Sequence, residues 1–223
     1  MDVPVLAYII VTVAAYRLGS IPTGYLVAKA KGIDIQKAGS GNIGATNAMR
    51  VLGKPAGIFV MLVDCAKGYA ACAFLPALIY DLLVAPSWEG VFENQPFDFQ
   101  LQFKVLAGGC AVLGHNYTCW LKFKGGKGIA TTAGVYLALA PLALGIALAV
   151  FILSIVITRY VSVGSILAAA VLPVAIWFTN ENMVLRIVTI ALCALAIYKH
   201  KSNIKRLMAG TESRFGKKPE ETK

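Results

Sequence analysis

Six long apolar blocks alternate with short polar segments along the chain. Most of them approach or exceed the roughly 20 residues that a helix needs to cross a bilayer. The blocks occupy residues 3–28, 55–85, 105–121, 128–158, 161–178 and 183–198. This pattern predicts an all-α, polytopic integral membrane protein.

The fourth apolar block is long for one helix and short for two full spans. It carries no charge, and Pro141 lies near its middle, where proline ends or kinks a helix. Basic residues gather in the segments 29–54, 122–127 and 199–223. The positive-inside rule puts all three segments on the cytoplasmic face only if the block is split at Pro141. We therefore expect seven transmembrane helices, with the N-terminus outside and the C-terminus in the cytoplasm.

The composition strengthens the membrane interpretation. Of the 223 residues, 58% are hydrophobic and only 14% are charged, whereas an average soluble domain has about 25% charged residues. This excludes a disordered chain and an ordinary soluble domain. We expect one transmembrane domain over residues 1–209, followed by a polar, loosely ordered cytoplasmic tail over residues 210–223.

The net charge of +10 draws attention to the basic segments, two of which are also rich in glycine. The first glycine segment, residues 38–50, reads AGSGNIGATNAMR. Glycine lets backbone N–H groups approach an anion, a helix starting near residues 43–46 would point its N-terminus at that anion, and Arg50 could clamp a phosphate. A flexible loop with a topogenic arginine is the alternative.

The second glycine segment, residues 123–128, reads FKGGKG and also precedes a predicted helix. It is a second candidate site for an anion. The alternative is a topogenic lysine cluster with glycines in a turn.

Two further polar clusters belong to the same predicted membrane face. Residues 162–165 (SVGS) are small enough to serve only for close helix packing, and residues 200–206 (HKSNIKR) are also consistent with the basic end of a helix. His200 and Asn203 are neighbours at i, i+3 on a helix. The two candidate anion sites favour a reaction between phosphorylated molecules at this face, and a transporter of organic phosphates is the main alternative.

Asp64 and Lys67 lie one helical turn apart inside the second apolar block. Charged residues within a membrane are usually functional or paired, and we favour a structural ion pair. The sequence has only two histidines, and no cluster of His, Cys and carboxylate residues has the spacing of a metal site, so neither a metal nor a cofactor is expected.

Several motifs resemble those of the bacterial acyl-phosphate:glycerol-3-phosphate acyltransferases, in the expected order from residue 19 to residue 212. They are Gly19–Gly24 (GSIPTG), Gly39–Arg50 (GSGNIGATNAMR), Asp64–Gly68 (DCAKG), Gly114–Tyr117 (GHNY), Phe123–Thr131 (FKGGKGIAT), Ser162–Ile166 (SVGSI) and His200–Glu212 (HKSNIKRLMAGTE). The resemblance implies a seven-helix enzyme of the bacterial inner membrane, with its active site at the cytoplasmic face. It also implies transfer of a fatty acyl group from acyl phosphate to the 1-hydroxyl of glycerol 3-phosphate. The products are 1-acylglycerol 3-phosphate (lysophosphatidic acid) and phosphate, in the first acylation of phospholipid biosynthesis. A related enzyme that takes its acyl group from acyl-CoA or acyl carrier protein is an alternative, and no nucleic acid partner is implied.

The resemblance also implies roles for individual residues. The catalytic set is Ser40, Arg50, Lys127, Ser165, His200 and Asn203. The residues expected to bind acyl phosphate are Ser40, Gly41, Asn42, Thr46 and Arg50. Those expected to bind glycerol 3-phosphate are Gly125, Gly126, Lys127, Gly128, His200 and Asn203. Asp64, Lys67 and Glu212 are expected to be structural.

The proton acceptor for the attacking hydroxyl is open between two groups. His200 has the right chemistry, because histidine titrates near neutral pH. The acyl-phosphate group itself is the other candidate, and we favour it because titratable side chains are scarce.

Overall fold

The computed structural model describes residues 3–84 and 98–216, and all the regular secondary structure within these ranges is helical. The chain divides into two compact units. The first unit comprises Met1–Thr23 and Met61–Leu139, and the second comprises Gly24–Val60 and Ala140–Lys223.

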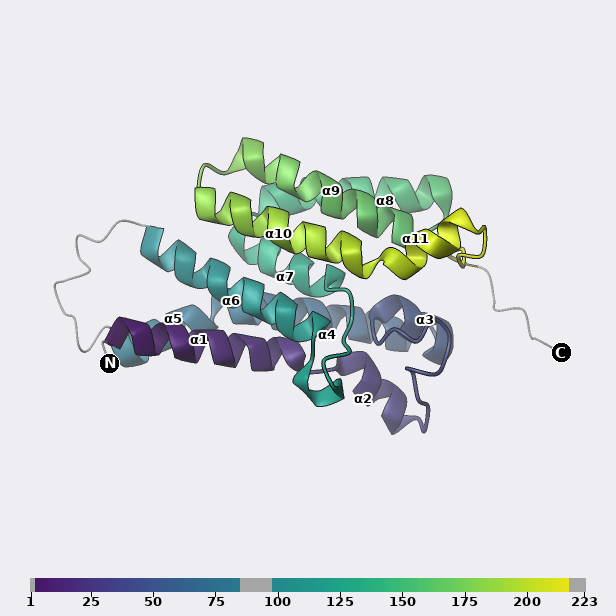
Figure 1. Ribbon diagram of the computed structural model, residues 1–223, viewed down its shortest axis with the longest axis horizontal. Helices are drawn as coiled ribbons and strands as arrows, with labels where there is room; N and C mark the ends of the chain where they lie inside the picture. The colour runs from purple at the N-terminus through teal and green to yellow at the C-terminus, as the bar shows by residue number, and fades with distance from the viewer. Residues whose placement is uncertain (1–2, 85–97, 217–223) are drawn as a thin grey trace. The chain divides into compact units, whose positions relative to one another are not determined.

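The first unit is built around α1 (Val3–Ser20) and α6 (Asp98–Asn116), which run side by side (Figure 1). It also contains most of α4 (Lys54–Ala73), the short α5 (Leu75–Ile79), a π-helical turn at Tyr80–Val84, a 3₁₀ turn at Cys119–Leu121 and α7 (Ile129–Leu139). Small residues such as Ala15 and Ala111 form the core between α1 and α6. A side chain at Gly19 would collide with the carbonyl of Ala111, so glycine lets the two helices approach closely.

The second unit contains α2 (Thr23–Ala30), α3 (Ala45–Leu52) and the first turns of α4. Its longer helices are α8 (Pro141–Thr158), α9 (Val161–Thr179) and α10 (Met183–Lys199), followed by the short α11 (Lys201–Met208). α9 packs against both α8 and α10 (Figure 1). Gly164 faces the carbonyl of Phe151 across the contact between α8 and α9, as expected if the small residues of 162–165 serve close packing.

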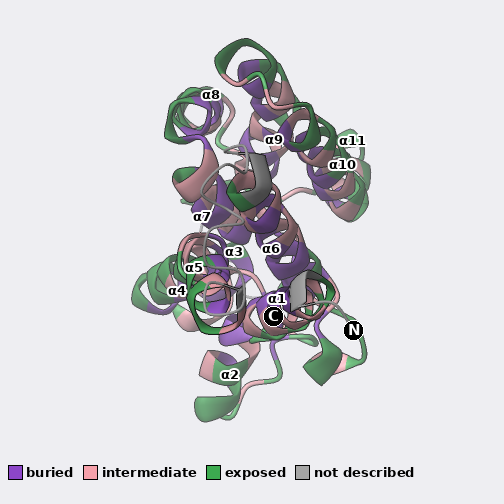
Figure 2. Ribbon diagram, turned by 90° about the vertical axis from the view of Figure 1, so that its left-hand side faces the viewer, coloured by how far each residue is buried: buried purple, intermediate pink, exposed green. Residues whose placement is uncertain are grey.

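Among the residues that the structure describes, four stretches are long and apolar enough to cross a membrane: Val5–Ala30, Lys54–Leu83, Pro141–Thr158 and Val161–Thr179. The pair α10 and α11, bent by 49°, makes a fifth if it counts as one span. Exposed residues lie along α8 (Figure 2), and large aliphatic side chains such as Ile152, Val156 and Ile157 are among them. An apolar outer surface of this kind suits contact with lipid.

The predicted break at Pro141 is present, and the structure has a second break at Pro22. α7 ends at Leu139 and α8 begins at Pro141, while α1 and α2 are separated at Ile21–Pro22. The second apolar block is broken as well, between α4 and α5, where Pro76 occupies the first turn of α5. That break was not predicted, although proline cannot donate the backbone hydrogen bond that a continuous helix needs.

The third apolar block begins earlier than predicted. The sequence analysis placed its start at residue 105, but α6 begins at Asp98, so residues 98–104 are helical. A helix can continue through charged residues near its end, because its backbone hydrogen bonds do not depend on the polarity of the side chains. Hydropathy alone therefore does not locate such a helix end. Residues 85–97, which precede this helix, lie outside the described residues.

Candidate functional site

The first glycine segment is closed by one buried side chain, that of Asn47. Its Oδ1 accepts a hydrogen bond from the backbone N–H of Ser40 at 2.8 Å. Its Nδ2 donates to the carbonyls of Ala38 at 3.0 Å and Asn42 at 2.8 Å. Because Asn47 is only 2% exposed, these bonds are shielded from water and fix the loop against the first turn of α3.

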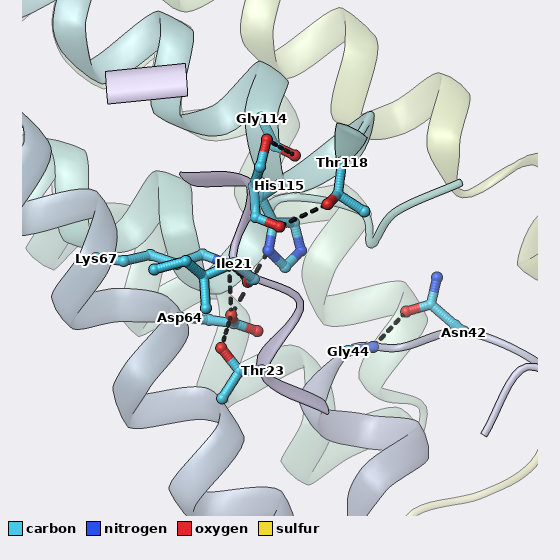
Figure 3. A network of polar contacts seen from close by, with 10 residues as sticks. Ile21, Thr23, Asn42, Gly44, Asp64, Lys67, Gly114, His115 and Thr118 are labelled. Carbon is cyan, nitrogen blue, oxygen red and sulfur yellow. Dashed lines mark hydrogen bonds and ion pairs between the residues drawn. The ribbon is translucent and has the colours of Figure 1, made fainter. Parts of the chain in front are cut away.

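The expected helix after this loop is confirmed, since α3 begins at Ala45. The Asn42 side chain accepts a hydrogen bond from Gly44 N–H at 2.8 Å, which orders the residue that precedes the helix (Figure 3). Ser40 and Thr46 are exposed, while Gly41 and Arg50 are half-buried. The segment therefore combines accessible hydroxyl groups, a helix N-terminus and an arginine, a set of groups suited to an anion.

The second glycine segment is held by its own backbone against the end of α6. Gly125 N–H donates to the carbonyl of Asn116 at 3.2 Å, and Gly126 N–H donates to the carbonyl of His115 at 3.0 Å. The two N–H groups that were expected to face an anion thus bond to carbonyls of the chain. Anion binding by this segment therefore depends on the Lys127 side chain and on the N-terminus of α7, which begins two residues later.

The glycines of this segment are needed for packing. A side chain at Gly126 would meet the imidazole of His115, and one at Gly128 would meet the side chain of Asn116. Gly128 also has a φ of +84°, which disfavours any residue with a Cβ atom. The glycines therefore stand at the positions where the segment lies directly against the end of α6.

A buried ionic network is centred on Asp64 and includes His115 of the GHNY motif. Asp64 Oδ1 is 2.8 Å from Lys67 Nζ, 3.1 Å from Thr23 Oγ1 and 3.6 Å from His115 Nδ1 (Figure 3). Lys67 Nζ also donates to the carbonyl of Ile21 at 2.8 Å, in the break between α1 and α2. The expected pair of Asp64 and Lys67 forms, and the network includes two residues, Thr23 and His115, that the sequence analysis did not assign.

His200 and Asn203 occupy the junction of α10 and α11, and both are buried. His200 Nδ1 lies 2.7 Å from the carbonyl of Ala196. A carbonyl can only accept, so Nδ1 carries a proton and, in a neutral ring, Nε2 carries the lone pair. Ser165, on α9, is buried too and donates from Oγ to the carbonyl of Val161 at 2.9 Å.

Glu212 ties the beginning of the tail to α11. Its Oε1 accepts from Asn203 Nδ2 at 2.7 Å, and its Oε2 lies 2.6 Å from Arg206 Nε. Partial burial alone would raise the pKa of Glu212, but hydrogen bonds from Asn203 and Arg206 outweigh it, so the pKa lies below its ordinary value.

The expectation of a loosely ordered tail is wrong for its first residues. Besides the Glu212 contacts, Phe215 N–H donates to the carbonyl of Arg159 at 2.6 Å. The side chain of Arg214 lies over the Tyr160 ring and donates from Nε to its hydroxyl at 3.1 Å. These contacts join the tail to the turn between α8 and α9, which a polar composition alone does not reveal.

Within residues 3–84 and 98–216, no group of three or more His, Cys, Asp or Glu side chains could hold a metal ion. Besides the Asp64 network, the polar groups described above belong to the first glycine segment, the second glycine segment and the junction of α10 and α11.

The comparisons with known proteins agree with the resemblance of the motifs. A sequence profile of the family "Glycerol-3-phosphate acyltransferase" matches residues 9–210. The glycerol-3-phosphate acyltransferase of Trichlorobacter lovleyi is 48% identical over 201 residues, which cover 90% of this chain and 94% of that protein. The corresponding protein of Geobacter sulfurreducens is 43% identical over 93% of this chain and 97% of its own length.

The fold is similar to two crystal structures of PlsY, an integral membrane glycerol 3-phosphate acyltransferase. The glycerol 3-phosphate form matches with a TM-score of 0.79 and 36% identity over 94% of this chain and 96% of that chain. The lysophosphatidic acid form matches with a TM-score of 0.76 over 94% and 95%. These similarities support an acyltransferase and not the alternative of a transporter. The chain is an all-helical integral membrane protein and belongs to the glycerol-3-phosphate acyltransferase family.

Proposed function

We propose that this protein transfers a fatty acyl group from acyl phosphate to the 1-hydroxyl of glycerol 3-phosphate. The hydroxyl oxygen forms a bond to the acyl carbon, the bond from that carbon to the phosphate oxygen breaks, and inorganic phosphate leaves. The other product is 1-acylglycerol 3-phosphate. Acyl phosphate is already an activated mixed anhydride, so the reaction as proposed needs neither a metal nor a cofactor. The protein has to position two anionic substrates and neutralise their charge.

The observation that carries this proposal is the first glycine segment, fixed by Asn47. In the proposal, Ser40, Gly41, Asn42 and Thr46 bind the phosphate of the acyl donor, and Arg50 neutralises its charge. The rigid loop supports this role, because donors that are already ordered cost no reorganisation when the phosphate binds.

The second substrate, glycerol 3-phosphate, is assigned to the second glycine segment and to the junction of α10 and α11. Lys127 supplies the cation for its phosphate, beside Gly125, Gly126 and Gly128. The imidazole of His200, oriented by Ala196, and the amide of Asn203, oriented by Glu212, bind its polar groups. Ser165 completes the set.

The proton of the attacking hydroxyl passes, in this proposal, to the phosphate of the acyl donor. His200 then binds substrate without acting as a base. Under this mechanism His200→Gln keeps most of kcat and raises KM for glycerol 3-phosphate. A loss of several decades in kcat, with normal KM, would instead identify His200 as the base.

We further propose that residues 1–209 form one catalytic domain with seven membrane spans, the N-terminus outside and the tail 210–223 in the cytoplasm. The host membrane is the bacterial inner membrane, and the reaction takes place at its cytoplasmic face. The three basic segments and the helix break at Pro141 support this topology. A cysteine introduced after residue 216 should react with a membrane-impermeant reagent only when the vesicles are opened. Labelling of this cysteine in intact cells would overturn the orientation.

The reaction is tested with purified protein, glycerol 3-phosphate and one acyl donor at a time. Acyl phosphate should give inorganic phosphate and 1-acylglycerol 3-phosphate in equal amounts. Acyl-CoA and acylated acyl carrier protein should give neither product. A reaction without glycerol 3-phosphate corrects for hydrolysis of the donor. Turnover with acyl-CoA alone would overturn the proposed donor.

A further inference from the structure

The ionic network of Asp64 has no direct role in the proposed reaction, yet it is costly for a membrane protein to bury. Asp64 and Lys67 are 2% and 5% exposed, and His115 is 5% exposed. Charges within a membrane are retained where they serve function or organise polar partners.

Two polar contacts of the network order the break between α1 and α2, which helical hydrogen bonds do not order. Lys67 Nζ bonds to the carbonyl of Ile21, in the break where Pro22 has no N–H to donate. Thr23 Oγ1 donates to Asp64 Oδ1 just after that break. The same Asp64 oxygen lies 3.6 Å from His115 Nδ1 at the end of α6.

His115 in turn supports the second glycine segment in two ways. Its carbonyl accepts the hydrogen bond from Gly126 N–H at 3.0 Å. Its ring lies directly against Gly126, because a Cβ at that position would collide with Nε2. Nδ1 thus faces Asp64 while Nε2 faces the residue that precedes Lys127.

We propose that Asp64, Lys67 and His115 are positioning residues for Lys127. Asp64 fixes the orientation of the His115 ring, Lys67 holds Asp64, and the ring forms the surface on which Gly126, the neighbour of Lys127, rests. This inference rests on the proposed function, in which Lys127 binds the phosphate of glycerol 3-phosphate. It assigns to the network a selective effect on that substrate.

The test is a double-mutant cycle between His115 and Gly126. Gly126→Ala should raise KM for glycerol 3-phosphate by about 10- to 100-fold, because the added methyl group displaces the segment from the ring. KM for acyl phosphate should stay unchanged. In the His115→Ala background the methyl group has room, so Gly126→Ala should add no further loss. Gly145→Ala on α8 is the matched control, since its Cβ meets nothing within 4 Å.

Equal penalties for Gly126→Ala in both backgrounds would overturn the proposal, as would equal changes in KM for the two substrates. Asp64→Asn should show the same split between the substrates as His115→Ala. If Asp64→Asn does not fold, the double-mutant cycle between His115 and Gly126 tests the proposal by itself. Turnover of the unmodified protein is measured first, because failure to acylate glycerol 3-phosphate there refutes the proposed function and not the contact between His115 and Gly126.

Discussion

The first and second glycine segments have similar compositions but are fixed by different parts of the chain. The first, residues 38–50, depends on the side chain of Asn47, which bonds to three backbone groups of the loop. The second, residues 123–128, depends on backbone bonds from Gly125 and Gly126 to the end of α6. A loop held by one side chain can be released by one substitution, whereas a loop held by its backbone tolerates loss of a side chain but not the addition of one.

The largest effect is expected for Asn47→Ala. The substitution removes three hydrogen bonds that order the loop, from Ser40 N–H and to the carbonyls of Ala38 and Asn42, each typically worth about 0.5–1.5 kcal/mol. We expect kcat/KM to fall by about 1,000-fold through loss of the ordered loop. Asn182→Ala is the matched control, because Asn182 also accepts a backbone hydrogen bond, from Leu185, but caps α10. Near-normal turnover of Asn47→Ala would break the comparison.

A smaller effect is expected for Lys127→Ala. Loss of one electrostatic contact to a transition state typically costs about 3 kcal/mol, or about 100-fold in rate. Because the backbone holds the second segment, the melting temperature should not change. Lys124→Ala removes an exposed lysine of the same segment and should keep activity. Normal kcat and KM for Lys127→Ala would refute its assigned role, and a lower melting temperature would show that its side chain also holds the segment.

Asn42→Ala should cost less again, about tenfold in kcat/KM, because it removes the single bond to Gly44 N–H and leaves Asn47 in place. Asn42→Ser can still accept a local backbone hydrogen bond and should recover most of the loss. Equal losses for both variants would show that the amide contacts substrate more than it orders the loop.

The smallest effect is expected where a carboxylate, not an amide, holds a segment. Glu212→Gln should lower the melting temperature by about 2–4 °C at pH 7. The pKa of Glu212 is lowered in the folded protein, so its charged form stabilises the fold above its unfolded pKa, and this contribution is lost as pH falls through the folded pKa. The difference between the two proteins should therefore shrink as pH falls below the unfolded pKa and vanish below the folded pKa. Asn47→Ala should show no such convergence, and Glu181→Gln in the turn after α9 is the matched control for the loss of one carboxylate at pH 7.

The sequence was most informative where a local rule decides the structure. Pro141 identified the break between α7 and α8, and the predicted helix start within residues 43–46 agrees with the start of α3 at Ala45. Pro76 carried the same information for the break before α5, but its apolar neighbours concealed it. Hydropathy did not reveal that residues 98–104 are helical, because a helical turn with charged residues and a loop with charged residues have similar hydropathy.

The contacts of the site were harder to predict because they join distant parts of the chain. Nothing in the first glycine segment distinguishes Asn47 from Asn42 as the buried amide. His115 meets Asp64 across 51 positions in sequence, and its ring matters through Gly126, a residue without a side chain. Composition identified the basic segments, but only packing shows which N–H groups are already bonded.

The spacing of Asp64 and Lys67 has a consequence for how the protein is made. The two residues are one turn apart on α4, so they can neutralise each other as soon as that helix forms, before any later helix exists. The pair can therefore enter the bilayer without isolated charges. His115 and then Gly126 leave the ribosome afterwards, so the order of translation assembles the support before the loop that rests on it.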